Sequence, residues 1–476
     1  MSRLGNGCRI FCTRAVAIAC VLLLVAGAAR TAETWEALYN VRIENVTVAP
    51  RDARTATVKL DISWPESWRD KVNHDAAWVF FKVRADDTSP WQHVRLVADK
   101  VLNPTGYGHE KGDTPLDFIV PDGDDGCTGL FVRRAAEGKG ALSARGVTAV
   151  WDFAANKGIP KDLKGVGLRP FGIQMVYVAE GPFCLGSGGA ELNGFYKYTD
   201  GSQANLPYRV ANAGAVPTGR REGRLWVRMR NGDMPEDGGE IPASFPNGYA
   251  AFYCMKYPIT CVQYAAFLNT LPAAQAESRY PGPPWKRSGE PPNCTYSAEE
   301  RGSRNRGPGA HGLSWADGAA FGAWAGLRPM TELEIEKALR GPRQPVPDEV
   351  GPSYWNVGGF DTWDWHAFKL AAQSERAVTV GHAAGRKFAG SHGRGSPTLP
   401  ADWPQEDAVG AGLRCSWYTP VYPRDAKPYQ GVDFGVGIDL PRTRTSDRLH
   451  AAFADPERHP HHKWRGVRTA PPAAGP

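Results

Sequence analysis

The sequence predicts a strand-rich protein of two modules, an all-β sandwich-like domain followed by a loop-rich α+β domain. Apolar and polar residues alternate in short runs over residues 39–153, and clusters of Asn, Asp, Gly and Pro separate these runs. Two short helices with clear start and stop signals follow between Leu313 and Gly341. The chain contains 54 Gly, 39 Pro and 16 Trp, a composition that favours turns around buried aromatic side chains over long helices.

The first 32 residues have the layout of a secretory signal peptide. Arg3, Arg9 and Arg14 form a basic region, residues 15–29 are apolar, and small residues follow. The apolar run is shorter than the roughly 20 residues that a membrane span needs. We therefore expect a mature chain without a transmembrane segment, either secreted or located in the periplasm or cell envelope.

Charge and cysteine content exclude several classes of protein. Removal of four arginines with the signal would lower the formal net charge from +6 to +2, and no basic run interleaved with aromatic residues is present. We therefore expect no nucleic-acid partner. Six cysteines remain beyond the signal, and none forms a C-x-x-C pair, so zinc-ribbon and thioredoxin-like sites are excluded. An oxidising compartment would permit one or two disulfides, whose pairing the sequence leaves open.

The first module is predicted over residues 33–155. Its expected strands lie in runs where apolar and polar residues alternate, although the third run alternates less strictly than the first two. A Lys/Gly-rich stretch with weak patterning, residues 156–172, is the expected linker. The expected strands are residues 39–48, 57–64, 77–83, 116–120, 129–133 and 147–153.

The second module is predicted over residues 173–468, and an Ala/Pro-rich tail, residues 469–476, is expected to be disordered. This module opens with strands at 173–178 and 181–186. Ser314 with Asp317, and Thr331 with Glu334, have the spacing of helix capping boxes. Gly341 is placed to end the second helix after Arg340. We interpret the acidic residues of this second helix as caps and solvated charges.

Several segments in this module resemble the sulfatase-modifying-factor family, whose members include formylglycine-generating enzymes. The order S-W-x-D-x-x-A-F-x-x-W-A-G-x-R-x-x-T-E-x-E-x-E-K-A-x-R-G, from Ser314 to Gly341, is similar to the family signature. The resemblance implies the irregular α+β fold related to C-type lectins. Further segments that agree are Met175–Val178 with Gly181, Phe183 and Gly186; Lys256–Thr260 with Tyr264, Phe267 and Asn269; Gly412–Trp417; and Trp464–Arg468.

The chemistry that the resemblance implies is only partly supported by the residues present. Formylglycine-generating enzymes hold copper with two cysteines just after an R-G-G-S-W core, and paired thiolates suit Cu(I). In this chain Thr419 and Arg424 stand near those positions. The family segment associated with calcium corresponds to residues 371–380, which lack its Asn and Trp. The sequence supports neither the copper nor the calcium of the family and leaves the cofactor unknown.

The sequence therefore predicts a scaffold of this family that acts as a binding module or pseudoenzyme for a peptide, protein or glycan. No metal ligand or catalytic residue is assigned. Two alternatives stay open: a metal-dependent oxidoreductase with other ligands that modifies a peptide or small metabolite, and a structural or adhesion protein of the cell envelope. The predicted binding groove comprises Arg414, Cys415, Ser416, Trp417 and Tyr418.

Overall fold

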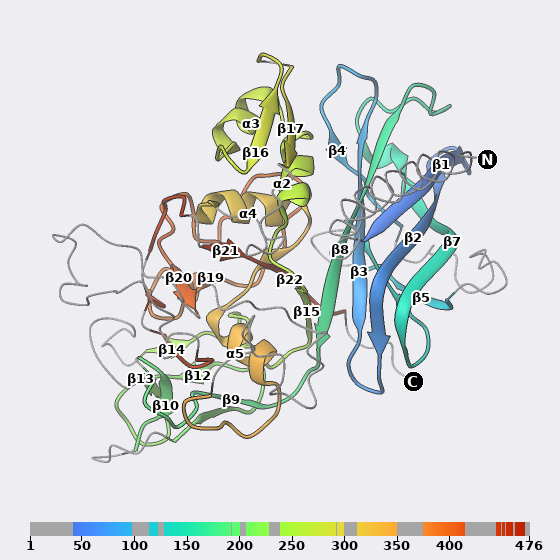
Figure 1. Ribbon diagram of the computed structural model, residues 1–476. Helices are drawn as coiled ribbons and strands as arrows, with labels where there is room; N and C mark the ends of the chain where they lie inside the picture. The colour runs from blue at the N-terminus through green and yellow to red at the C-terminus, as the bar shows by residue number, and fades with distance from the viewer. Residues whose placement is uncertain are drawn as a thin grey trace, which may run out of the picture.

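The computed structural model is rich in strands and contains few helices (Figure 1). The predicted signal peptide, residues 1–32, lies outside the part of the chain that the structure describes. Among the described residues, none of the helices combines the length and apolar character that crossing a membrane requires. The described residues are 41–97, 114–121, 128–191, 193–199, 206–227, 239–291, 293–298, 312–349, 375–414, 444–448, 450–452, 454–459 and 462–471.

All six predicted runs of the first module overlap strands. In β2 the side chains alternate between buried and more exposed positions, as the period-two pattern predicts. A short 3-10 helix, Phe153–Ala155, follows the last of these strands. The strands are β1 (Arg42–Pro50), β2 (Thr55–Arg69), β3 (Asp75–Arg84), β4 (Gln92–His93), β5 (Leu116–Ile119), β6 (Leu130–Arg134) and β7 (Gly138–Asp152).

Strand β3 contributes side chains to two apolar cores, one on each of its faces. Its residues Val79, Phe81 and Val83 pack in a core with side chains of the three-stranded sheet β1-β2-β7. On its other face Trp78 and Phe80 pack in a second core with residues of the later helices. A strand buried on both faces needs apolar residues at successive positions. This explains why the run 77–83 alternates less strictly than its neighbours.

One sheet joins the two predicted modules. Strand β8 (Gly167–Val178) pairs antiparallel with β3 along one edge and with β15 (Phe252–Met255) along the other (Figure 1). The eight-stranded sheet then continues through β22 (Gly466–Thr469) to β18 (Arg328–Pro329). Residues 167–172, part of the expected linker, are therefore strand, because β3 satisfies their backbone hydrogen bonds whatever their side-chain pattern.

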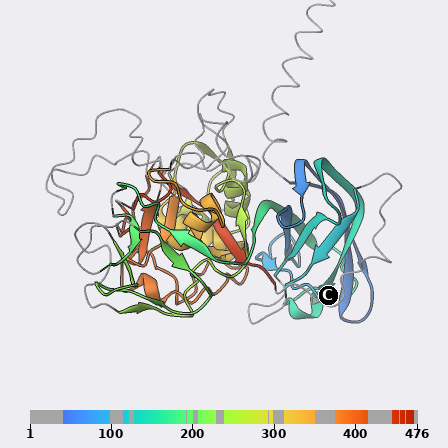
Figure 2. The ribbon, with the colours of Figure 1, turned by 90° about the horizontal axis from the view of Figure 1, so that it is seen from below.

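The other strands of the second module form small sheets around its helices. Figure 2 shows the two gold helices inside this part of the molecule, beside the blue and teal strands of the first module. The helices are α2 (Cys261–Leu268), α3 (Ala273–Arg279), α4 (Trp315–Trp324) and α5 (Glu332–Arg340), and a 3-10 helix spans Gly385–Lys387. The small-sheet strands are β9 (Phe183–Leu185), β10 (Phe195–Lys197), β11 (Tyr208–Val210), β12 (Val216–Pro217), β13 (Leu225–Val227), β14 (Glu240–Ile241), β16 (Trp285–Ser288), β17 (Thr295–Ala298), β19 (Glu375–Val378), β20 (Ala411–Arg414) and β21 (Lys463–Trp464).

The end of the second module is more ordered than its composition indicates. Thr469 completes β22 opposite Phe252, and the Ala470 amide donates to the carbonyl of Ala251 at 3.0 Å. The first two residues of the expected tail are thus held by the sheet, because backbone pairing does not depend on the Ala/Pro side chains. Residues 472–476 lie beyond the described chain.

Both predicted capping boxes are confirmed. The Ser314 hydroxyl accepts from the Asp317 amide at 3.0 Å and the Asp317 carboxylate accepts from the Ser314 amide at 3.1 Å. Thr331 and Glu334 exchange the equivalent bonds at 3.2 and 2.9 Å. Gly341 follows α5 with φ +66°, a conformation that glycine adopts without steric cost.

The α4 surface is flattened by two glycines so that the Trp464 ring can pack on it. A Cβ atom at Gly318 would lie 2.4 Å from Trp464 Cγ, and one at Gly322 would lie 2.3 Å from Trp464 Cη2. Both distances are far below van der Waals contact. The indole of Trp464 therefore occupies the space that two side chains would otherwise fill.

Replacing Gly322 by alanine is expected to destabilise the protein by about 1–3 kcal/mol, because overpacking the buried Trp464 outweighs the gain in helix propensity. Urea denaturation measures the change in the free energy of unfolding. Trp464→Phe and the double variant complete a cycle, and the glycine substitution should be less harmful when it is combined with Trp464→Phe. A neutral or stabilising effect of Gly322→Ala in the otherwise unchanged protein would contradict this packing.

Candidate functional site

Of the predicted groove residues, only Arg414 lies in the described part of the chain. It ends β20, is 1 % exposed, and directs its guanidinium at α5. The Nη2 atom donates to Glu336 Oε1 at 2.9 Å, and Nη1 donates to the Glu332 carbonyl at 3.0 Å. Further bonds reach the carbonyls of Thr445 and Asp447. Arg414 thus points into the protein, and Cys415, Ser416, Trp417 and Tyr418 lie outside the described residues.

Glu332 stands at the centre of a buried ion-pair cluster. Arg448 Nε and Nη2 donate to its two carboxylate oxygens at 2.7 and 3.0 Å. The Thr379 hydroxyl, the Val380 amide and Arg414 donate as well. Five donors fill a carboxylate that offers about four lone-pair sites. Burial opposes ionisation of this group, but Arg448 and Arg414 outweigh burial and hold the pKa of Glu332 below its usual value.

Glu336 lies one turn further along α5 and is held in the same way. Its carboxylate accepts from the Gly186 amide at 2.8 Å and from the Ser446 hydroxyl at 3.2 Å, in addition to Arg414 and Arg340. The interpretation of the α5 acids as solvated charges is wrong for Glu332 and Glu336, which are fully buried. The i, i+4 spacing puts both on one helix face, and arginines from distant segments meet that face.

The described residues of this cluster suit a structural role better than a chemical one. Both carboxylates are fully engaged, so neither is available as a general base. In the part of the chain that the structure describes, no three His, Cys, Asp or Glu side chains come together as a metal ion requires. The residues near 371–380 that correspond to the family's calcium segment include β19, where Glu375 pairs with Arg465 Nε at 2.9 Å.

Among the described cysteines, Cys184, Cys254 and Cys294 are thiols, and no two of the described cysteines form a disulfide. Cys254 lies on β15, where burial raises the pKa of its thiol to about 12. Reactivity follows the thiolate, so this burial makes Cys254 inert. Cys127 and Cys415 lie outside the described residues.

We expect Cys254 to resist alkylation in the native protein and to react only after unfolding. Iodoacetamide treatment at pH 8, followed by peptide mass spectrometry, measures this site by site. Cys294, which is only partly buried, serves as the internal control and should be modified in the native state. Equal modification of the two cysteines before denaturation would contradict the burial of Cys254.

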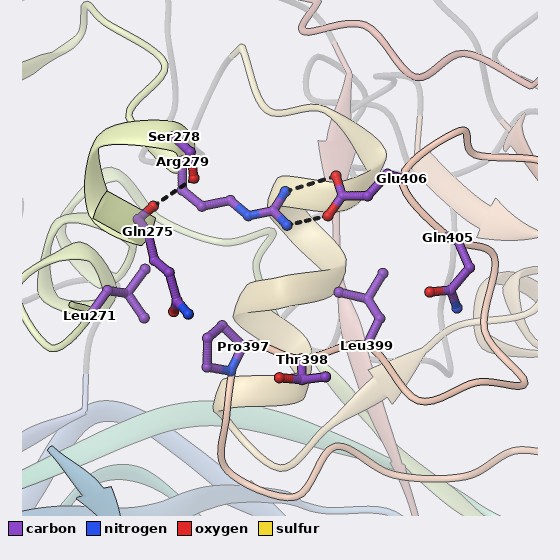
Figure 3. A pocket seen from close by; sticks show the side chains of 9 residues that line it. All are labelled: Leu271, Gln275, Ser278, Arg279, Pro397, Thr398, Leu399, Gln405 and Glu406. Atoms are coloured by element: carbon purple, nitrogen blue, oxygen red, sulfur yellow. Dashed lines mark hydrogen bonds and ion pairs between the residues drawn. The ribbon is translucent and has the colours of Figure 1, made fainter. Parts of the chain in front are cut away.

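Two neighbouring hollows form a groove that runs along the second module and reaches the edge of the first. The first, of about 330 Å³, lies between α3 and residues 397–406 (Figure 3). Across it the Arg279 guanidinium meets the Glu406 carboxylate in a two-pronged pair. Gln275 and Thr398 supply further polar groups, one from each wall.

The second hollow, of about 270 Å³, lies between β4 and residues 394–397. Leu271 and Pro397 line both hollows, so the two adjoin. Lys82 and His93 lie at its base, where Lys82 Nζ donates to the carbonyls of Trp324 and Gly395, each at 2.7 Å. The remaining lining residues are Trp91, Gln92, Arg95, Ala155, Asn156, Thr270, Pro272, Arg394 and Ser396.

The sequence prediction missed this groove. Its outer wall, S-H-G-R-G-S-P-T-L-P over residues 391–400, has no periodic pattern. The sequence feature that could have indicated this groove is the pair of glycines Gly393 and Gly395. A Cβ at Gly393 would lie 2.2 Å from Ala323 Cα of α4, and one at Gly395 would lie 2.1 Å from His93 Cγ. Glycines that permit such close approach indicate an ordered segment pressed against the fold.

Comparison with known proteins gives one family. The family model described as "Sulfatase-modifying factor enzyme 1-like domain" matches residues 212–387. The matched segment contains α2 to α5, including both confirmed capping boxes, and ends at Lys387 before β20. No curated protein matches the chain. The resemblance identified from the sequence is thus confirmed over residues 212–387, which are similar to a sulfatase-modifying factor enzyme 1-like domain.

Proposed function

We propose that the chain is an exported binding protein whose sulfatase-modifying-factor-like domain holds a peptide or glycan and lacks the copper-cysteine oxidase activity of formylglycine-generating enzymes. The observation that carries this proposal is the groove made by the two adjoining hollows. Its lining mixes charged, amide and hydroxyl groups with Leu271, Pro397 and Leu399. This mixture suits an extended polar ligand.

Three finer assignments belong to the same proposal. The shared core between the β1-β2-β7 sheet and β3 supports a sandwich-like first module. The few short helices among small sheets support a C-type-lectin-like second module. The basic and apolar pattern of residues 1–32 supports export to the periplasm, envelope or exterior, which sequencing the N-terminus of the mature protein in fractionated cells would test.

The groove is tested by blocking it. Thr398 is exposed on the wall of the first hollow, and Thr398→Trp would fill that space without touching the core. Any ligand found on arrays of peptides and neutral and acidic glycans should bind the Thr398→Trp variant at least about tenfold more weakly. Ser297→Trp places the same side chain at an exposed site on β17 and should leave affinity unchanged. Absence of any ligand, or equal binding by both variants, would refute the groove.

The oxidase activity has its own test. Purified protein loaded with copper would be incubated aerobically with a peptide containing C-x-P-x-R, and formylglycine would be sought by mass spectrometry. We expect none, because Thr419 and Arg424 stand near the positions of the paired cysteines. Stoichiometric conversion of the peptide would overturn the pseudoenzyme proposal.

A further inference from the structure

Trp91 is the one tryptophan in the described part of the chain that is not buried. It comes just before β4, lines the second hollow and belongs to none of the three apolar cores. The other described tryptophans, each at most 7 % exposed, are Trp64, Trp68, Trp78, Trp151, Trp226, Trp285, Trp315, Trp324, Trp403 and Trp464. Packing in a core therefore does not explain the position of Trp91. Tryptophan is enriched among the residues that contribute most to binding, because its ring offers a large, rigid contact area.

Two guanidinium groups hold the Trp91 ring in place. Those of Arg84 and Arg169 lie 4.8 and 4.7 Å from its centroid, within the range of a cation–π contact. Arg84 Nη1 donates to the Asp87 carbonyl at 3.0 Å, and Arg169 Nη1 donates to the Asn269 carbonyl at 3.5 Å. A ring that is already fixed loses little conformational freedom when a ligand binds to it.

Two fixed amide side chains line the same hollow as the ring. Gln92 Nε2 donates to the Lys157 carbonyl at 2.7 Å, and its Oε1 accepts from the Lys157 amide at 2.9 Å. Asn156 Oδ1 accepts from Trp151 Nε1, and its Nδ2 donates to the His93 carbonyl, both at 2.9 Å. A side-chain amide has two hydrogens and two lone pairs, so each of these two keeps one donor and one acceptor. Both can therefore bond to hydroxyl groups of a ligand that enters the hollow.

The charged groups of this hollow are engaged by the protein itself. Lys82 Nζ lies 2.8 Å from His93 Nδ1 and donates to two main-chain carbonyls at 2.7 Å. Burial lowers the pKa of both Lys82 and His93, which weakens any positive charge at the base. Arg95 Nη2 donates to the Arg394 carbonyl at 3.3 Å. None of the described residues that line the hollow carries a carboxylate. A neutral ligand therefore suits this hollow better than an ion.

We propose that the groove binds a neutral oligosaccharide and that one of its pyranose rings stacks on Trp91. The proposal rests on the binding function proposed above and chooses the class of ligand. The C–H groups on one face of a pyranose pack against an indole, while the hydroxyls at its edge need hydrogen-bond partners. Gln92, Asn156 and Ser396 supply donors and acceptors around the same hollow. This pairing of a flat apolar surface with fixed amides favours a sugar over a peptide, whose hydrogen-bonding groups lie along its backbone.

The test uses titration calorimetry of the full mature protein with cellohexaose, mannohexaose and hexaproline. We expect at least one of the two hexasaccharides to bind, and Trp91→Ala to weaken that binding at least about tenfold. Trp91→Phe should retain part of the affinity, because a smaller ring still stacks. Tyr208→Ala truncates a partly exposed aromatic residue on β11 that lines neither hollow, and it should leave the affinity unchanged.

Tryptophan fluorescence gives a second readout of the same contact. Iodide should quench part of the emission of the native protein, and the bound hexasaccharide should protect that part. The protected part should be absent from Trp91→Phe, because the other described tryptophans are buried.

Three outcomes would overturn the assignment. Neither hexasaccharide could bind, or Trp91→Ala could leave the affinity unchanged. Tighter binding of hexaproline that is lost in Trp91→Ala would give the ring to a proline-rich peptide instead. A ligand that Thr398→Trp blocks and Trp91→Ala does not would preserve the groove proposed above, while removing Trp91 from it.

Discussion

Replacing Glu332 by glutamine is expected to destabilise the protein by about 3–5 kcal/mol, because it leaves Arg448 buried without its carboxylate. Arg448 and Glu332 are both fully buried, and two guanidinium nitrogens of Arg448 bond to the two oxygens that the substitution alters. In chemical denaturation the midpoint concentration of denaturant should be lower, and the dependence of the free energy of unfolding on denaturant concentration should be unchanged. Glu277→Gln removes one partner of the exposed Arg287–Glu277 pair and should leave the midpoint unchanged.

A double variant separates lost charge pairing from general damage. Arg448→Met on the Glu332→Gln background removes the guanidinium that has lost the Glu332 carboxylate, and it should recover part of the lost stability. Two outcomes would contradict this role of the ion pair. Glu332→Gln could unfold no more easily than Glu277→Gln. Alternatively, the effects of Glu332→Gln and Arg448→Met on the free energy of unfolding could be additive.

The pH dependence of the same variant follows from the pKa of Glu332. That pKa is lowered in the folded protein, so the unfolded chain takes up the proton first as pH falls. The carboxylate therefore contributes stability above the unfolded pKa of about 4.3, and this contribution is lost as pH falls through the lower folded pKa. The difference in stability between native protein and Glu332→Gln should be constant near neutrality and should shrink below about pH 4.

Replacing Trp78 by alanine is expected to lower the free energy of unfolding by about 3–5 kcal/mol. The side chain is fully buried between the two predicted modules. Its indole Nε1 donates to the Ala325 carbonyl at the end of α4 at 2.8 Å. Phe131 packs at a centroid distance of 4.8 Å, and the Arg468 guanidinium lies 4.6 Å above the ring. The substitution thus removes apolar contacts, a hydrogen bond and a cation–π contact at one point.

Calorimetry of Trp78→Ala and Trp78→Phe measures this loss. Trp78→Phe keeps most of the apolar contact and should be much less harmful than alanine. Because β3 serves both cores and one sheet runs through both modules, we expect the melting of the whole chain to shift as one transition. Two results would contradict the role of Trp78 in packing the two modules together. One is a shift confined to one of two separated transitions, and the other is a decrease in the free energy of unfolding below about 1 kcal/mol.

The sequence alone identified six strands of the first module, but not β4, and the helices from Leu313 to Gly341, because these elements depend on local patterns. Buried and more exposed side chains alternate along β2, as apolar and polar residues alternate in its sequence. The hydrogen bonds of the two capping boxes join residues three positions apart. The local order of residues also carried the family resemblance, which the match over residues 212–387 confirmed. Short-range geometry links these features directly to the residues that produce them.

Only the tertiary structure decided how these elements are used. Glu332 and Arg448 are 116 positions apart, and Lys82 and Gly395 are 313 apart. No local pattern tells a solvated glutamate from one that distant arginines will bury, or a run of glycines and serines from the wall of a groove. Burial and electrostatic partners depend on chain packing. The strand-rich character of the chain and its family resemblance could therefore be predicted from the sequence. The hollow between β4 and residues 394–397 forms only when β3, α4 and that segment pack together.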